Sequence, residues 1–143
     1  MAKSGEVHVD GQVIPMTATD INNAGTYTVT PTTQLPGMGY MVAQAKFVYG
    51  SGGTSCKAYV QTSLDGGVTW IDIASFAFLL ATATKVSAVT MQVALGAAVT
   101  PTDGTLADNT IVNGLLGDRI RVKYVVVGTY AGTTLEVDIL AKG

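Results

Sequence analysis

The chain has 143 residues, a formal net charge of −2, and a composition that is 48% hydrophobic but only 13% charged. Soluble domains have about 25% charged residues, so this chain has few ionised groups for its size. The basic excess that phosphate contacts need is missing, which argues against a nucleic-acid partner.

A chain of this length predicts one domain over residues 1–143 with a sizeable core. Its one cysteine, Cys56, has no intrachain disulfide partner, and its alternating apolar surroundings predict a buried side chain. The one histidine, His8, shares a strand face with Glu6 and Asp10, which we interpret as a solvated face rather than a metal site. The sequence predicts no catalytic, cofactor-binding or metal-binding residues.

No export or membrane segment is predicted. The N-terminus MAKSGEVHV lacks the apolar stretch of a signal peptide. Asp72 and Lys85 interrupt the most apolar region, Ile71–Val99, and its uncharged runs are shorter than the ~18–20 residues of a membrane helix. We therefore expect synthesis in the cytoplasm and no membrane partner.

The first half of the chain alternates between apolar and polar residues in the manner of strands. The run GTYTVTP is expected to end at Pro31 and to lead into a crossing loop at 31–39. In SCKAYVQTS, the alternation places Cys56, Ala58 and Val60 on one face. The expected strands of this half are residues 6–14, 25–31, 40–50, 55–63 and 68–78.

The second half continues the pattern with one interruption. Residues 86–95 alternate and predict a strand, whereas 74–83 is the best helical candidate and is equally compatible with a buried strand. The turn-rich stretch at about 96–117 predicts a long excursion with at most short strands.

The last two alternating segments, 118–127 and 134–140, are predicted to pair as a hairpin with cross-strand charge pairs on the outer face. The basic residues of this prediction are Arg119, Arg121 and Lys123, and the acidic ones are Glu136 and Asp138. Eight to ten short strands with frequent turns together indicate an all-β fold, a two-sheet antiparallel β-sandwich of jelly-roll type.

The stretch SLDGGVTW at 63–70 has the pattern S-x-D-x-G-x-T-W and resembles the Asp-box hairpin of sialidases and other β-propeller proteins. Gly66 and Gly67 supply the positive φ angles of a tight turn, and the Asp65 carboxylate is placed to accept backbone N–H groups. Thr69 adds a hydroxyl, and Trp70 is expected to close the hairpin as an apolar plug.

This stretch is interpreted as a structural turn and not as a hydrolase site. It occurs once, whereas the box tends to repeat across propeller blades, and a propeller needs a longer chain. A glycosidase needs a pair of carboxylates at a defined separation. Asp65 and Asp72 are the nearest acids in sequence, and nothing marks either as a catalytic acid.

Three segments together resemble small structural proteins of tailed phages: KAYVQTSLDGGVTWIDIASFAF, PTDGTLADNT and GLLGDRIRVKYVVVGTYAGTTLEVDILAKG. The resemblance implies a non-enzymatic virion component, first a capsid decoration (cement) protein and next a minor tail or head-completion protein. Its implied partners are further copies of the chain, as a homotrimer or dimer, and the major capsid protein. The low charge agrees, because interface cores are depleted of charge.

Two other classes of function compete with this interpretation. A carbohydrate-binding module would use exposed aromatic side chains as a platform, with Trp70, Tyr40, Tyr49 and Tyr59 as candidates. An enzyme is not expected, because the single His, the single Cys and the scattered acids form no reactive constellation.

Overall fold

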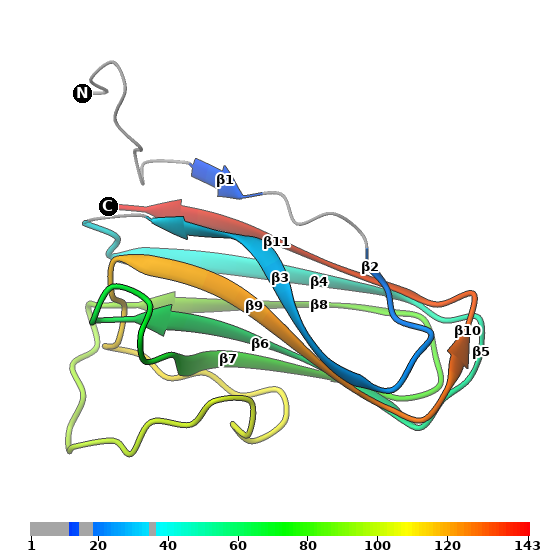
Figure 1. Ribbon diagram of the computed structural model, residues 1–143. Coiled ribbons are helices and arrows are strands. Elements are labelled where there is room, and N and C mark those ends of the chain that lie inside the picture. The colour runs from blue at the N-terminus through cyan, green and yellow to red at the C-terminus, as the bar shows by residue number, and fades with distance from the viewer. Residues whose placement is uncertain (1–11, 15–18, 35–36) are drawn as a thin grey trace.

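The structure, a computed structural model, describes residues 12–14, 19–34 and 37–143 (Figure 1). Within these ranges the chain forms strands, turns and loops and contains no helix. The metal-site alternative at Glu6, His8 and Asp10 lies outside the described residues. In chain order the strands are β1 (Gln12–Ile14), β2 (Thr19–Asp20), β3 (Gly25–Gln34), β4 (Tyr40–Val48), β5 (Ser51–Gly52), β6 (Ser55–Ser63), β7 (Ile71–Phe78), β8 (Ala83–Thr90), β9 (Arg119–Val127), β10 (Tyr130–Ala131) and β11 (Thr134–Lys142).

The longer strands form two antiparallel sheets that pack face to face (Figure 1). Sheet A has the order β1-β11-β4-β8, with β2 beside β11, and sheet B has the order β3-β9-β6-β7. The all-β, two-sheet antiparallel β-sandwich is therefore confirmed. The jelly-roll part stays a prediction, with which this strand order is compatible.

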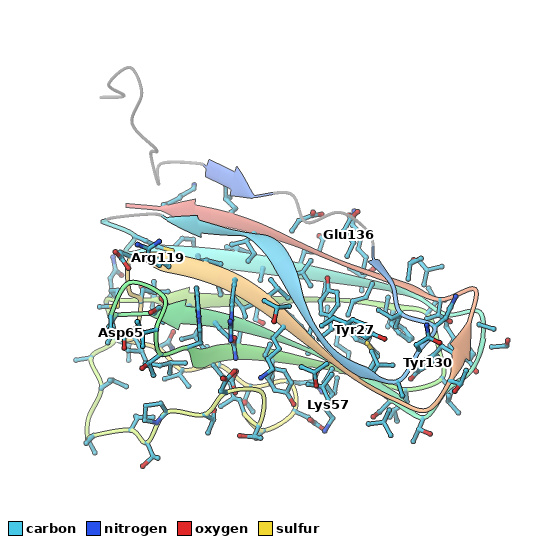
Figure 2. All side chains as sticks on the ribbon, viewed as in Figure 1. Tyr27, Lys57, Asp65, Arg119, Tyr130 and Glu136 are labelled. Carbon is cyan, nitrogen blue, oxygen red and sulfur yellow. The ribbon has the colours of Figure 1, made fainter. Side chains whose placement is uncertain are left out.

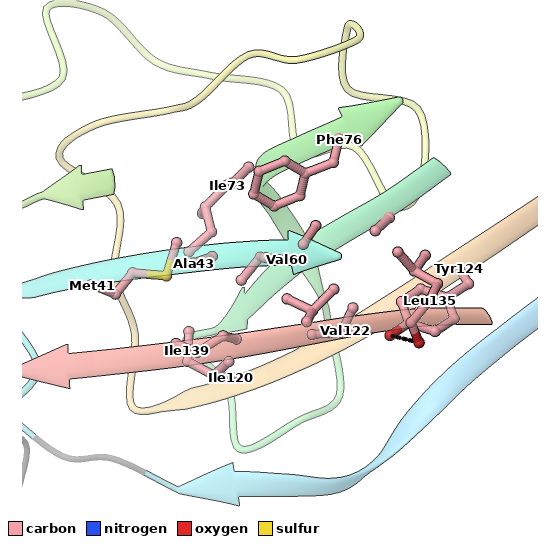
Figure 3. Close-up of a cluster of buried hydrophobic side chains, with 14 of the residues drawn as sticks. Met41, Ala43, Val60, Ile73, Phe76, Ile120, Val122, Tyr124, Leu135 and Ile139 are labelled. Atoms are coloured by element: carbon pink, nitrogen blue, oxygen red, sulfur yellow. Dashed lines mark hydrogen bonds between the residues drawn. The ribbon is translucent and has the colours of Figure 1, made fainter. Parts of the chain in front are cut away.

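The core lies between the sheets and follows the period-2 alternation of each strand. Ala43, Ala45 and Phe47 alternate along β4 and point inward, and all three are buried. Figure 3 shows Tyr124 of sheet B against Leu135 of sheet A, where the tyrosine hydroxyl donates to the leucine carbonyl. Strands of both sheets thus contribute to one core.

The predicted hairpin of the last two long strands is wrong. β9 pairs with β3 and β6 in sheet B, whereas β11 pairs with β4, β1 and β2 in sheet A. The segment between them includes β10, which pairs with β5 and carries the chain from one sheet to the other. The two strands therefore face each other across the core through their apolar sides, and their charged sides point in opposite directions.

Some strand boundaries differ from the predictions, and the alternative left open for 74–83 is decided. β3 continues past Pro31 to Gln34 with a register shift between Val29 and Thr33, an irregularity that tolerates a residue without an N–H. β7 ends at Phe78, as the predicted strand 68–78 does, so the helical alternative for 74–83 is wrong. β8 stops at Thr90, and the expected alternation up to residue 95 does not continue.

The long excursion between β8 and β9 is confirmed. An isolated bridge between Ala74 and Ile111 and several hydrogen bonds link it to β7. In Figure 1 this yellow-green stretch leaves the sandwich after β8 and returns beside β7. It therefore acts as a cover over one side of sheet B.

Candidate interaction surface

The SLDGGVTW turn connects β6 to β7 and is held by short polar bonds. The Ser63 hydroxyl donates to Asp65 Oδ1 (2.9 Å), and its oxygen accepts the Gly67 N–H (2.9 Å). The Thr69 N–H donates to the same Asp65 oxygen (2.7 Å). Gly66 and Gly67 have φ angles of 73° and 93°, as tight turns of this kind require.

The Asp65 carboxylate is stabilised in its ionised form. The N–H and then the hydroxyl of Thr69, with a further bond from Ser63, lower the pKa of Asp65 to about 2. An acid with so low a pKa is a hydrogen-bond acceptor at neutral pH and a poor proton donor. Its role as a structural turn stays a prediction, and the bonds in the turn are those that such a role needs.

Trp70 lies at the base of this turn and is covered. The residue is only 9% exposed, and the Arg121 guanidinium lies over its ring at 4.3 Å from the ring centroid. Tyr59 is buried, and the Tyr49 hydroxyl donates to the Gly52 carbonyl (2.9 Å). Tyr40, at 37% exposure, is the remaining exposed member of the four candidate aromatics. The four do not form one exposed platform.

Asp72 anchors the excursion to β7. Its buried carboxylate accepts the backbone N–H groups of Gly104, Thr105 and Leu106 (2.8, 3.0 and 3.1 Å) and the Thr102 hydroxyl (2.8 Å). Successive N–H groups converging on one anion form a nest. This side chain is therefore fully engaged in holding the cover in place.

Gln61 continues the network across sheet B. Its amide nitrogen donates to Asp72 (2.8 Å) and Asp103 (2.6 Å), and its oxygen accepts from Arg121 (2.6 Å). Lys123 also contacts Asp103, at 3.0 Å. The excursion therefore supplies an acidic partner for two of the basic residues of β9.

The acidic residues of β11 have a different partner from the one predicted. Glu136 and Asp138 lie beside Lys46 of the neighbouring β4, at 3.6 and 3.8 Å. Figure 2 shows Glu136 on the outside of sheet A, far from Arg119 at one end of sheet B. The predicted charge pairs between β9 and β11 are therefore wrong, because the two strands belong to different sheets.

Apolar side chains gather at the end of the sandwich where β6, β8 and β11 end, which also contains Asp65 and Arg119 in Figure 2. The loops here are contiguous: Gly114 lies against the backbone of residues 93–95, and Gly117 lies against Ser63 and Leu64. The segment 91–101 contains no charged residue. We call this surface the loop end, and its exposed large apolar residues are Tyr40, Leu64, Val68, Met91, Val93 and Leu95.

A shallow groove of about 560 Å³ runs between the outer face of sheet B and the excursion. It is lined by Lys57, Tyr59 and Asp108 among others, and Lys57 pairs with Asp108 at 2.8 Å. Cys56 points to the other side, into the core, where burial raises the pKa of its thiol to about 12. Within the described residues no three His, Cys, Asp or Glu side chains gather as a metal site.

The chain matches no protein-family model, no curated protein and no solved structure. The resemblance to tailed-phage structural proteins is therefore neither supported nor opposed by these comparisons. In the described part of the chain, no helix is long and apolar enough to span a membrane.

Sequence reasoning singled out the turn at 63–70 but missed the network of Gln61, Asp72 and Asp103. The signal that was available is an acid inside an apolar strand: Asp72 is flanked by Ile71 and Ile73. A buried charge needs partners, and PTDG at 101–104 is a turn whose N–H groups can supply them. The distance between the two segments along the chain hid this connection.

Proposed function

We propose that the protein is a non-enzymatic virion component of a tailed phage. In this proposal it is a capsid decoration (cement) protein that binds copies of itself, as a homotrimer or dimer, and binds the major capsid protein. It would strengthen the head shell through protein–protein contacts. The sequence resemblance is the reason for proposing a tailed phage, and the exposed apolar surface at the loop end is the reason for proposing assembly with other proteins.

The observation that carries the proposal is the loop end. Six large apolar side chains are exposed there, and Val68 at the tip of its turn is 83% exposed. The segment 91–101 adds no charge to this surface. Exposed apolar side chains that lie together on a soluble domain mark protein interfaces, where burying them from water drives association. The loop end is therefore the surface we assign to the capsid.

Binding to capsid shells tests the proposal. Shells from the virus that carries this coding sequence, stripped of the protein, are mixed with purified protein and sedimented. We expect saturable binding with a fixed number of copies per shell and a higher temperature of shell disruption. A protein that stays in the supernatant at all concentrations would contradict the proposal.

Paired variants locate the binding surface. Val68→Lys and Val93→Lys place charges on the loop end and should weaken shell binding at least tenfold, because a buried unpaired charge is strongly unfavourable. Val48→Lys and Val127→Lys place the same charge on exposed valines at the opposite end. Equal losses from both pairs would show that the loop end is not the capsid-binding surface.

A further inference from the structure

The hydrogen bonds at the end of β8 determine which of its residues face away from β4. The Thr90 N–H donates to Asn113 Oδ1 (3.0 Å), and its carbonyl accepts the Gly114 N–H (2.8 Å). The next residue faces the other way, since the Met91 N–H donates to the Gly39 carbonyl (2.9 Å) in line with β4. Backbone groups alternate sides along a strand, so the even-numbered residues of β8 point away from β4.

This outer edge of β8 is open in the described part of the chain. Its even-numbered residues are Thr84, Val86 and Ala88, and all three are exposed. No described residue outside β8 forms a hydrogen bond with their N–H or C=O groups. The open stretch is bounded by the turn at 79–82 and by the contacts of Thr90, which leaves Val86 at its centre. A row of unpaired backbone groups is a template for another strand.

We propose that a second copy of this chain binds this edge, with β8 pairing antiparallel to β8 about a twofold axis through Val86. The inference rests on the part of the proposed function in which the chain binds itself. In this register Val86 lies opposite Val86 of the second copy, and Thr84 lies opposite Ala88. Each of these pairs exchanges both backbone hydrogen bonds, because these residues face the open edge on both strands.

The side chains of β8 agree with this register. Thr84, Val86 and Ala88 are uncharged, and Val86, 62% exposed, gains a β-branched partner from the second copy. Lys85 lies opposite Ser87 of the second copy. A slip by two residues would place Lys85 opposite Lys85, and like charges directly opposite destabilise a sheet. The charge pattern therefore favours the register centred on Val86.

A second copy fits the edge because the open stretch of β8 is short and has Val86 at its centre. Two copies related by a twofold axis through Val86 therefore overlap over the whole stretch. The Lys85 side chain does not stand in the way, since it bonds to residues of its own sandwich. Its ammonium donates to the Ala77 carbonyl (2.6 Å) and to Asn109 Oδ1 (3.1 Å). The dimer would join the two A sheets into one continuous sheet, β1-β11-β4-β8 followed by the same strands in reverse.

A proline substitution removes the edge contact and spares the fold. Val86→Pro deletes an N–H that points away from β4, a position at which an edge strand tolerates proline. By light scattering we expect wild type and Val86→Thr to be dimers at micromolar concentrations and Val86→Pro to be a monomer, with an unchanged sheet signal by circular dichroism. A wild-type monomer, or a Val86→Pro dimer, would overturn the inference.

A cysteine at the same position tests the register without proline. Cys56 is buried and its pKa is raised to about 12, so Val86→Cys adds the one thiol that reacts in the native state. A hydrogen-bonded antiparallel pair has a Cα separation of about 5.5 Å, which a disulfide can span. Under mild oxidant we expect a covalent dimer of Val86→Cys at least tenfold faster than of Val68→Cys. Equal rates would contradict the proposed register.

The capsid assay separates the two proposals. A wild-type monomer that binds shells would overturn the β8 pairing and the self-association, and would leave capsid binding in place. A wild-type dimer that disappears in Val86→Pro and binds no shell would support the β8 pairing and overturn the capsid proposal.

Discussion

β7 and β8 are the edge strands of sheets B and A on one side of the sandwich. The outward backbone groups of β7 are hydrogen-bonded, whereas among the described residues those of β8 before Thr90 are not. Along β7, the N–H groups of Asp72 and Ser75 donate to carbonyls of the excursion (2.8 and 3.0 Å), and that of Ala77 donates to Asn109 Oδ1 (3.0 Å). Lys85 donates to the Ala77 carbonyl. Along β8, the outward backbone groups have no such partner among the described residues up to Thr90.

The difference shows how a short sandwich can protect one edge and leave another available. Covering β7 requires a long turn-rich segment, the excursion, and the buried Asp72 carboxylate that holds this segment in place. β8 has only Lys85, whose inward-pointing side chain is a device that discourages unspecific strand pairing.

Removing the anchor of the cover should have the largest effect on stability. Asp72→Ala leaves the N–H groups of residues 104–106 without their acceptor and leaves Gln61 with one acidic partner fewer. We expect a loss of about 3 kcal/mol or more, because truncating one side of a buried charged network leaves polar groups unsatisfied. Urea unfolding measures it, and a loss below about 1 kcal/mol would mean that Asp72 does not anchor the cover.

Substitutions of Asn109 should have an intermediate effect on stability, and two of them separate the loss of hydrogen bonds from backbone strain. Asn109 accepts with its side chain from the Ala77 N–H and from Lys85, and its φ of 57° lies in the left-handed region. Asn109→Gly loses the bonds but keeps the backbone freedom, with an expected loss of about 1 kcal/mol. Asn109→Ala adds backbone strain of about 1–2 kcal/mol. Equal stabilities of the two variants, from urea unfolding, would contradict the strain.

Acid should weaken the cover through Asp103. Burial raises the pKa of Asp103, but the bonds from Gln61 and Lys123 and the charges of Lys123 and Arg121 together bring it below the ordinary value of 3.8. A lowered pKa stabilises the fold above pH 3.8, and this contribution is lost as the pH falls through the folded-state value. The melting temperature should therefore fall below about pH 4, and less steeply in Asp103→Asn. Identical slopes in the two proteins would contradict this assignment.

The stability of the fold should depend least on the charges on the outer face of sheet A. Lys46 is about half exposed where it meets Glu136 and Asp138 on the outside of sheet A. Surface ion pairs contribute about 0–1 kcal/mol, so Lys46→Ala should cost at most about 0.5 kcal/mol, and 0.5 M salt should erase the difference. A loss as large as that of Asp72→Ala would show that sheet A depends on its outer charges.

Much of the local structure could be predicted from alternation and turn residues. The inward side chains of β4, the buried Cys56 and the excursion at 96–117 follow from period-2 patterning and from clusters of Gly, Pro and Asn. The network around Asp72 could not be predicted, because it joins residues about thirty positions apart. The loop end was missed for a related reason. Met91, Val93 and Leu95 alternate as in a strand, yet β8 stops at Thr90, because Asn113 and Gly114 of the excursion bind the Thr90 backbone.

The β-sandwich follows from the amino-acid pattern alone, because an apolar residue at every second position gives each strand one face that must be buried. The pattern also determined the turn at 63–70, whose glycines and Asp65 act over a few residues. Which strands are neighbours became clear only from the folded chain. Alternation fixes the face of a strand but not its partner. Thus β9 and β11, consecutive long strands in the chain, lie in different sheets. For the same reason β7 is covered, whereas the outer edge of β8 has no backbone partner among the described residues.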